Sequence, residues 1–127
     1  MITLSRKQKQ TQTFPLIIDG GGQVIPANAE YFFHIDYAGE FQAWTGLTDV
    51  QGSIQVDIYK ETYAEYPKSV PVSICAAALP TITNAKKGQD NTLTGWTKKC
   101  VAGEVFRIKV ISCETIKRFT LGFKVKK

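Results

Sequence analysis

The sequence is poor in the residue types that catalysis and metal binding use most. Its 127 residues include one histidine, His34, and three cysteines, none of which belongs to a Cys-x-x-Cys pair. Zinc sites need closely spaced Cys and His ligands, and a thiolate nucleophile needs an adjacent base. No spacing places a cysteine beside His34, and the Gly20–Gly22 run lacks the Gly-Lys-Ser/Thr continuation of a phosphate loop. We therefore expect no metal site, no cofactor and no enzyme, with a hydrolase as a remote alternative.

Long apolar runs and helical periodicity are also lacking. No run approaches the ~18 apolar residues that a membrane helix needs, and the polar N-terminal residues do not resemble a secretory signal. No window repeats apolar residues at i, i+3, i+4 and i+7. We therefore expect synthesis in a cytoplasm, no membrane insertion, and at most short helical turns at Glu61–Glu65 and Cys75–Leu79.

The charge is unevenly distributed along the chain. The net charge is +5, but residues 98–127 alone carry nine cations and two anions, and residues 10–97 carry four cations and nine anions. The first residues add Arg6, Lys7 and Lys9 without any regular apolar pattern. We expect a flexible basic arm over residues 1–12 and one domain over residues 13–127. Opposite charges in two regions would let copies pack against one another or onto an acidic surface.

Alternation of apolar and polar residues dominates the rest of the sequence. Within Glu104–Ser112 and Thr115–Lys126, apolar residues alternate with outward-facing ones, as in strands with one buried face. The apolar residues are Phe106, Ile108 and Val110 in the first range and Phe119, Leu121, Phe123 and Val125 in the second. The linker Cys113-Glu114 has the length of a hairpin, which predicts that these two strands pair antiparallel. Polar Asn84–Asn91 is predicted to be a loop. The other predicted strands are Thr13–Asp19, Glu30–Asp36, Phe41–Leu47, Ser53–Tyr59, Val70–Ile74 and Leu93–Trp96.

About eight short antiparallel strands with turns between them predict an all-β fold. A β-sandwich of this size with eight strands is most often a jelly roll, so we expect a single jelly-roll-like sandwich. Trp44 and Trp96 are expected in its core.

Three tyrosines and four cations are the candidate binding residues of the domain. Tyr59, Tyr63 and Tyr66 lie in or next to a loop that Pro67 ends, where they either stack on sugars or pin the loop to the sheet. The four cations alternate with the apolar residues of the last two predicted strands and should face outward, either toward phosphates or toward solvent and neighbouring subunits. No outward aromatic residue interleaves with these cations, so we expect no specific nucleic-acid binding. These cations are Arg107, Lys109, Arg118 and Lys124.

Several motifs together resemble a small β domain of tailed bacteriophages. In that family one finds an IDGGG run, a W-x-L-x-A-D-x-x-G-S-I-V-V-D-I-W-K segment, a T-Y-A-N-Y-P loop and an L-T-G-W segment that ends in A-G-D. The resemblance covers almost the whole chain, from about Phe14 onward. Its motifs are similar to Ile18–Gly22, Trp44–Lys60, Thr62–Pro67 and Leu93–Glu104.

This chain departs from the family pattern at a few positions. Tyr59 stands where the family has Trp, and Glu104 replaces the Asp of the A-G-D turn. The cysteines also stand where small or polar residues would be expected.

The resemblance implies a structural protein at the virion surface, on capsid, baseplate or fibre, and a homotrimer. Because the sequence starts with Met and shows no fibre shaft, we expect a capsid decoration or accessory protein that contacts the major capsid protein through its basic residues, Arg6, Lys7 and Lys9 among them. The alternative is a tail-fibre module that binds host surface glycans. The recurrence of the tyrosine-bearing loop in the family favours a structural role for that loop.

The cysteines have two open interpretations. They are either buried reduced residues or partners in interchain disulfides that form outside the cytoplasm. Cys100 and Cys113 flank a predicted strand, which rises ~3.3 Å per residue, and are therefore too far apart to bridge within one chain. We expect any disulfide to involve Cys75 or a cysteine of a neighbouring protein.

Overall fold

The computed structural model describes residues 11–127, and these residues form strands, turns and loops without a helix. The basic residues Arg6, Lys7 and Lys9 lie outside the described residues. No helix long and apolar enough to cross a bilayer occurs in the described residues. Of the two predicted helical turns, the first is a single turn in which the Tyr66 amide donates to the Thr62 carbonyl at 3.1 Å, and the second is a turn in which the Ala78 amide donates to the Cys75 carbonyl at 2.9 Å; neither continues into a helix. The strands are β1 (Thr11–Asp19), β2 (Glu30–Ile35), β3 (Gly39–Glu61), β4 (Val72–Ser73), β5 (Thr81–Asp90), β6 (Lys99–Cys100), β7 (Glu104–Glu114) and β8 (Arg118–Lys126).

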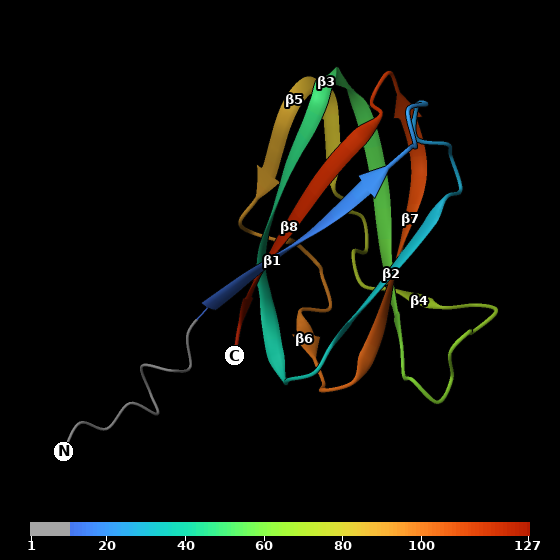
Figure 1. The fold of residues 1–127 in the computed structure, drawn as a ribbon. Coiled ribbons are helices and arrows are strands. Elements are labelled where there is room, and N and C mark those ends of the chain that lie inside the picture. The colour runs from blue at the N-terminus through green and yellow to red at the C-terminus, as the bar shows by residue number, and fades with distance from the viewer. Residues whose placement is uncertain (1–10) are drawn as a thin grey trace.

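The eight strands form one antiparallel sheet that curls into two facing layers (Figure 1). The main strand order is β1-β8-β3-β7-β2, with β4, β5 and β6 each paired to β3. The expected all-β, jelly-roll-like sandwich is thus confirmed. β1, β8 and the first half of β3 make one layer, and the second half of β3, β7 and β2 make the other.

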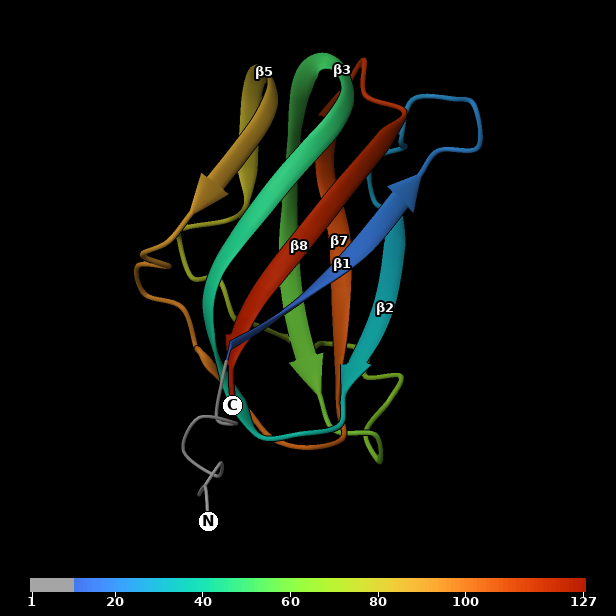
Figure 2. The same ribbon diagram turned by 60° about the vertical axis from the view of Figure 1, so that its left-hand side comes forward.

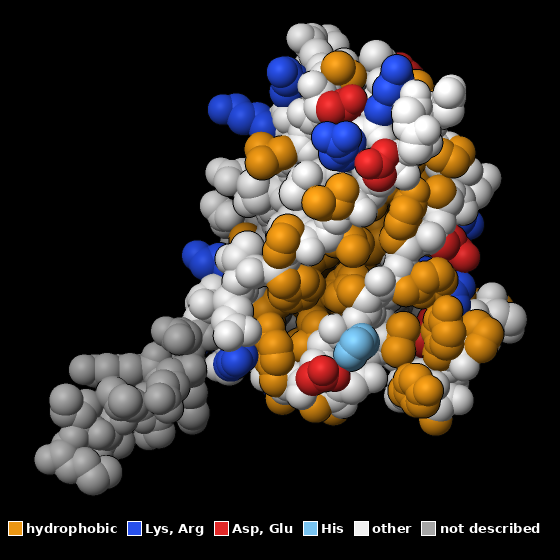
Figure 3. Space-filling view, in the orientation of Figure 1, with side chains coloured by type: hydrophobic (Ala, Val, Ile, Leu, Met, Phe, Trp, Pro, Cys, Tyr) orange, Lys and Arg blue, Asp and Glu red, His pale blue; other side chains and the backbone are white. Residues whose placement is uncertain are grey.

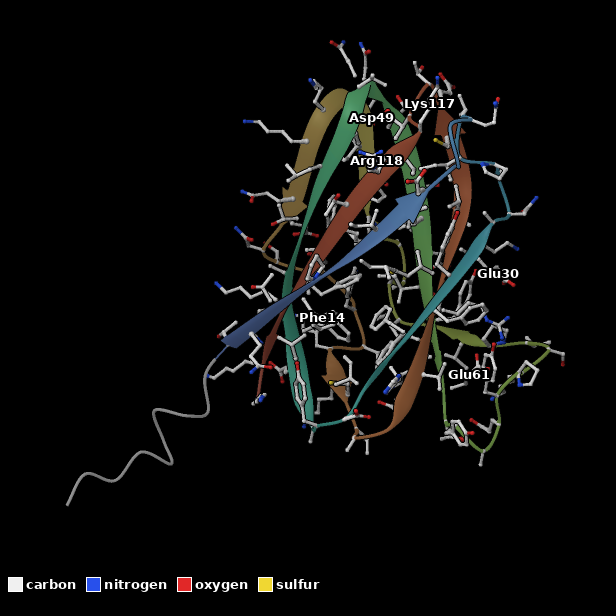
Figure 4. All side chains as sticks on the ribbon, in the orientation of Figure 1. Phe14, Glu30, Asp49, Glu61, Lys117 and Arg118 are labelled. Atoms are coloured by element: carbon white, nitrogen blue, oxygen red, sulfur yellow. The ribbon has the colours of Figure 1, made fainter. Side chains whose placement is uncertain are left out.

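β3 connects the two layers. It runs up one layer, bends over the top of the molecule and runs down the other (Figure 2). The bend lies between the predicted strands Phe41–Leu47 and Ser53–Tyr59, where pairing changes from β8 to β7. The two are one strand, because β3 is not interrupted there. At this end Asp49 accepts hydrogen bonds from the amides of Lys117 and Arg118, at 3.1 and 3.2 Å (Figure 4).

The prediction of a loop over Asn84–Asn91 is wrong, because all of these residues except Asn91 belong to β5. Its start pairs with the second half of β3 and its end with the first half, so β5 follows the same bend. The sequence lacks alternation here because most side chains on both faces of β5 are exposed to solvent. The predicted strand Leu93–Trp96 is a turn, with Leu93 at a φ of 51°.

The predicted hairpin of the last two strands is wrong. β7 pairs with β2 and β3, and β8 pairs with β1 and β3, so the two strands lie in opposite layers. The linker has the length of a hairpin turn but passes from one layer to the other. The alternation itself was correctly interpreted, because its apolar residues are buried. These residues are Phe106, Ile108, Val110, Phe119, Leu121, Phe123 and Val125.

Aromatic rings fill the space between the layers. Phe41 contacts both Phe106 and Phe123 edge-on, with ring centroids 5.4 and 5.6 Å apart. Trp44 and Trp96 are buried as expected, and the Trp96 indole N–H donates to the carbonyl of Ala78 at 2.8 Å.

Candidate binding site at the tyrosine loop

Residues 62–71, here called the tyrosine loop, are held against the sheet by a buried ion pair. Glu61, at the end of β3, has a fully buried side chain and lies 3.2 Å from the Arg107 guanidinium of β7. The Glu61 carboxylate also accepts a hydrogen bond from the Lys68 amide at 2.9 Å, and Arg107 donates to the Lys68 carbonyl at 3.2 Å. Glu30 of β2 adds a second carboxylate 3.5 Å from Arg107 (Figure 4). The loop is therefore anchored from its middle as well as from its ends.

A second set of bonds fixes the start of the tyrosine loop. The Thr62 amide donates to the Glu65 carboxylate at 3.2 Å, and the Glu65 amide donates to the Thr62 hydroxyl at 3.1 Å. The hydrogen bond from the Thr62 backbone, followed by the charge of Lys68, lowers the pKa of Glu65 below its ordinary value. This reciprocal pattern is the one that caps helix N-termini, used here in an isolated turn.

The two tyrosines of the loop have different surroundings. Tyr66 packs edge-on against Phe32 of β2, with ring centroids 5.4 Å apart, and the Arg107 guanidinium lies over the same Phe32 ring at 5.5 Å. Tyr63 is 80% exposed. Tyr66 therefore pins the loop, as one of the two sequence interpretations has it, whereas Tyr63 presents its ring to solvent. Stacking of Tyr63 on a sugar stays a prediction.

A groove of about 450 Å³ lies between the tyrosine loop and the lower end of β2. Aromatic side chains dominate its walls, and the exposed His34–Asp36 pair, 3.3 Å apart, provides polar groups at one side. The size is typical of small-molecule sites. The groove is lined by Phe32, Phe33, His34, Asp36, Tyr63, Tyr66, Gly103 and Val105.

Exposed apolar side chains surround the groove, and we call them the corner patch. They come from β2, the tyrosine loop, β4 and the turn before β7, and they form part of the hydrophobic cluster in the lower right of Figure 3. Contiguous apolar surface of this kind usually marks an interaction site. The corner patch comprises Phe32, Tyr63, Tyr66, Val70, Val72 and Val101.

Tyr59 does not belong to this surface. It is half-buried on β3, opposite Ser73 of β4, and it does not line the groove. Burial, followed by the charge of Asp57, raises the pKa of its hydroxyl above the ordinary value. The structure thus joins Tyr63 and Tyr66 and leaves out Tyr59.

The prediction that Arg107 faces outward to solvent is wrong. Its position on the outer face of β7 follows the alternation, but the tyrosine loop covers that face, and the residue is only 8% exposed. Lys109 is half-buried on the same strand. Arg118 and Lys124 are exposed on β8 in the other layer, where Arg118 lies 3.5 Å from Asp19. The four cations therefore do not form one basic face.

The three cysteines are free in the structure. Cys75 and Cys100 are buried, and Cys113 is half-buried, with its sulfur 3.4 Å from the Ile116 carbonyl oxygen. Burial raises the pKa of all three thiols above the ordinary value. An interchain disulfide remains a prediction, and Cys113 is the cysteine whose burial least obstructs it.

One wall of the groove, formed by β2, could have been predicted from the run of aromatic residues in that strand. Tyr31, Phe32 and Phe33 are consecutive on a strand, so at least one large ring must face away from the core. That ring is Phe32, which the tyrosine loop meets. Gly103 lies beside β2 because its amide donates a hydrogen bond to the Ile35 carbonyl at 2.6 Å. The two residues are 68 positions apart, so no local sequence pattern indicates this contact. Within residues 11–127 no group of three His, Cys, Asp or Glu residues is placed to hold a metal ion.

Comparisons with known proteins add little to this description. No protein-family model matches the sequence, and no curated protein matches it. Among solved structures, RmlC from Streptococcus suis, in complex with dTDP-D-xylose, matches over 95% of this chain and 46% of that chain, with 8% sequence identity and a TM-score of 0.26. The chain thus spans less than half the length of that protein, and a likeness this weak carries no argument about function.

Proposed function

We propose that this protein is a non-catalytic structural protein of a tailed-phage virion, a capsid decoration or accessory fibre protein that binds another virion protein through the corner patch. The observation that carries the binding role is the exposed apolar surface around Tyr63, on a loop that the buried Glu61–Arg107 pair anchors to the sheet. The motifs shared with the phage β domain support the placement on a virion. On this proposal the protein is a homotrimer at the virion surface.

Two properties of the corner patch favour a protein partner. Aromatic side chains each bury about 150–250 Å² in contacts, so the patch offers several hundred Å², a substantial share of the ~800 Å² that each partner contributes to a standard interface. The loop is already ordered by its own hydrogen bonds, so binding costs little additional conformational entropy.

Quantitative mass spectrometry of purified particles tests the proposal. We expect hundreds of copies per particle for a capsid decoration protein and few for a fibre protein. The double variant Tyr63→Ser/Val101→Ser should be lost from particles, because it removes two exposed apolar contacts without touching the core. Leu47→Ser is the matched control, since Leu47 is 54% exposed in the other layer, and it should be retained. Absence of the wild-type protein from particles, or equal retention of both variants, contradicts the proposal.

The same particles test the disulfide. Two thiols lose two electrons and two protons to molecular oxygen after the particle leaves the cytoplasm, and Cys113 is the half-buried candidate. Reductant should loosen the protein on wild-type particles and leave Cys113→Ser particles unaffected. A protein that runs only as a monomer on non-reducing gels rules this link out.

Glycan binding is the second candidate function, favoured by the His34–Asp36 pair beside the aromatic wall of the groove. Exposed rings stack on the apolar faces of sugars, and the carboxylate and imidazole would bind hydroxyl groups. Host surface oligosaccharides should then bind the wild-type protein and not Tyr63→Ala. Retained binding in Tyr63→Ala, or no binding by the wild type, excludes this function.

A further inference from the structure

The groove between the tyrosine loop and β2 combines aromatic walls with an exposed carboxylate. Its outward rings come from two elements, Phe32 from β2 and both Tyr63 and Tyr66 from the tyrosine loop. The face of an aromatic ring carries partial negative charge and attracts cations. Several rings around one groove are the arrangement with which proteins recognise alkylated ammonium groups.

One ring of the groove already holds a cation of the chain itself. The Arg107 guanidinium lies over the Phe32 ring, 5.5 Å from its centroid. Arg107 is only 8% exposed, and the carboxylates of Glu61 and Glu30 lie 3.2 and 3.5 Å from it (Figure 4). The Phe32 ring therefore accepts a cation in this fold, while the two carboxylates compensate the positive charge of Arg107.

The charges near the groove favour a positive ligand, although the protein has a net charge of +5. Lys68 of the tyrosine loop and Lys60 of β3 each lie 3.4 Å from a carboxylate. Asp36 lines the groove, and its side chain is 78% exposed. Within residues 11–127 its only ionic partner is His34, at 3.3 Å, which is charged only when protonated. Asp36 is therefore able to pair with a cation that enters the groove.

We propose that the groove binds a trimethylammonium group, as in choline, between its rings and Asp36. Such a group has a permanent positive charge, apolar methyl groups and no N–H that would need an acceptor. Aromatic walls and one exposed carboxylate match these properties without further polar side chains. A primary ammonium would instead bring three donors that each need an acceptor.

This inference does not rest on the proposed virion role. It concerns a small cation in the groove, and it is an alternative to the glycan for that groove alone. The tests below use the purified full chain without particles, so their failure leaves the proposed binding of a virion protein standing.

Titration with choline, followed by the NMR shifts of the Tyr63, Tyr66 and Gly103 amides, is the first test. The matched probe is the neutral carbon analogue of choline, in which a tert-butyl group replaces the trimethylammonium group. We expect saturable binding of choline and at least about tenfold weaker binding of the analogue, because its attraction to the rings and to Asp36 is lost. No saturable shift with choline, or equal affinity for the two compounds, overturns the inference.

Variants of exposed residues locate the site. Tyr63→Leu keeps an apolar side chain but removes the ring, and Asp36→Asn removes the charge, so each should weaken choline binding at least about threefold. Tyr63→Phe retains the ring and should bind like the wild type. Asp19→Asn, on β1 and outside the groove, makes the same change as Asp36→Asn at an exposed carboxylate and should have no effect. Unchanged binding in Tyr63→Leu or Asp36→Asn, or an equal loss in Asp19→Asn, overturns the inference.

A trimethylammonium group can reach the groove on a soluble ligand or on a lipid headgroup, and vesicles distinguish the two sources. If the wild type cosediments with phosphatidylcholine vesicles and Tyr63→Leu does not, the groove binds the headgroup. If choline binds but vesicles do not, the groove binds the same group on a soluble ligand. Equal cosedimentation of Tyr63→Leu and the wild type overturns the groove as the site of lipid contact.

Discussion

Arg107 carries its charge at a position that water scarcely reaches, and its partners explain why this is tolerated. Glu61, Glu30 and the Lys68 carbonyl surround its guanidinium. Its Nε, like the indole nitrogen of Trp44, has no hydrogen-bond partner among the described residues. Such a pair stabilises a fold only while both members are present, since either one alone is a buried, uncompensated charge.

Replacing Arg107 by Met should therefore lower the free energy of unfolding by about 3–5 kcal/mol, measured by urea denaturation. The double variant Arg107→Met/Glu61→Leu should recover most of this loss, although the Lys68 amide loses its acceptor. Lys124→Gln, on an exposed site, is the control and should change stability by less than about 0.5 kcal/mol. If the double variant is less stable than Arg107→Met, the pair does not act as described.

Two glycines on neighbouring strands differ in how much room surrounds them. A Cβ on Gly46 would lie 2.6 Å from the Phe119 ring and 3.1 Å from Ile82, whereas on Gly122 it would meet nothing closer than 3.7 Å. Gly46→Ala should therefore cost about 1–3 kcal/mol through overpacking. Gly122→Ala, with the same chemical change, should be close to neutral. Thermal unfolding of the two variants decides, and equal midpoints would contradict the packing argument.

The buried thiol of Cys75 should make the free energy of unfolding depend on pH in the alkaline range. Burial raises the pKa of its thiol, so the folded protein keeps the proton at pH values where the unfolded chain releases it. This contribution is complete below the ordinary thiol pKa of about 8.5 and is lost as pH rises above it, by up to about 1.4 kcal/mol per pH unit.

We therefore expect the free energy of unfolding, measured in reductant from pH 7 to 10.5, to fall more steeply for the wild type than for Cys75→Ala. Deprotonation of the lysines is common to both proteins and cancels in the comparison. Parallel curves would mean that the Cys75 thiol has the same pKa in the folded and unfolded protein, which contradicts its burial.

Among the elements, β1 shows most directly how successive side chains of a strand point alternately to solvent and to the core. Ile17 is 59% exposed and its neighbour Ile18 is fully buried. Ile18→Asn should lower the free energy of unfolding by more than about 3 kcal/mol, since it buries a polar group and removes core contacts. Ile17→Asn should cost less than about 1 kcal/mol. Chemical denaturation of both variants checks the register, and the reverse order would place β1 one residue out of step.

Strand existence could be predicted from alternation, but strand partners could not. Phe106, Ile108 and Val110 alternate with polar residues because one face of β7 is buried, and the same is true of β8. Alternation does not say which strand lies alongside, and the short linker suggested a hairpin where the chain crosses between layers. β5 was missed because a strand with little buried surface on either face carries no alternation.

The candidate site was predictable only in part for a related reason. Tyr63 and Tyr66 attract attention in the sequence, but their partner Phe32 is 34 residues before Tyr66 and meets it only because the tyrosine loop folds back over β2. The burial of Arg107 follows from the same fold-back. Contacts of this kind depend on the whole fold, and no local pattern encodes them.

For the whole molecule, the pairing of the first and last strands brings the two ends of the described chain together. Thr11 and Lys126 are register partners in β1 and β8. A circular permutant that joins the ends through a short linker and opens the chain between Gly21 and Gly22 should therefore fold, because this loop lies between β1 and β2 and a Cβ on either glycine would meet nothing within 4 Å.

We expect the circular dichroism spectrum of this permutant to match that of the wild type, with a melting temperature within a few degrees. A permutant opened between Gln55 and Val56 interrupts β3 where it pairs with both β5 and β7 and should not fold cooperatively. Equal behaviour of the two permutants would contradict the central place of β3.

The continuous bend of β3, accompanied by β5, connects the two layers mechanically in addition to the side-chain packing between them. Where layers are joined only by loops, a force that slides one over the other is resisted by side-chain packing alone. Here the same backbone belongs to both layers over the top of the molecule, so sliding them loads covalent bonds and two hydrogen-bond ladders at once. A force applied to one face is thereby transmitted to the other as tension along the backbone of β3, and the closed end of the sandwich should be its stiffest part under load.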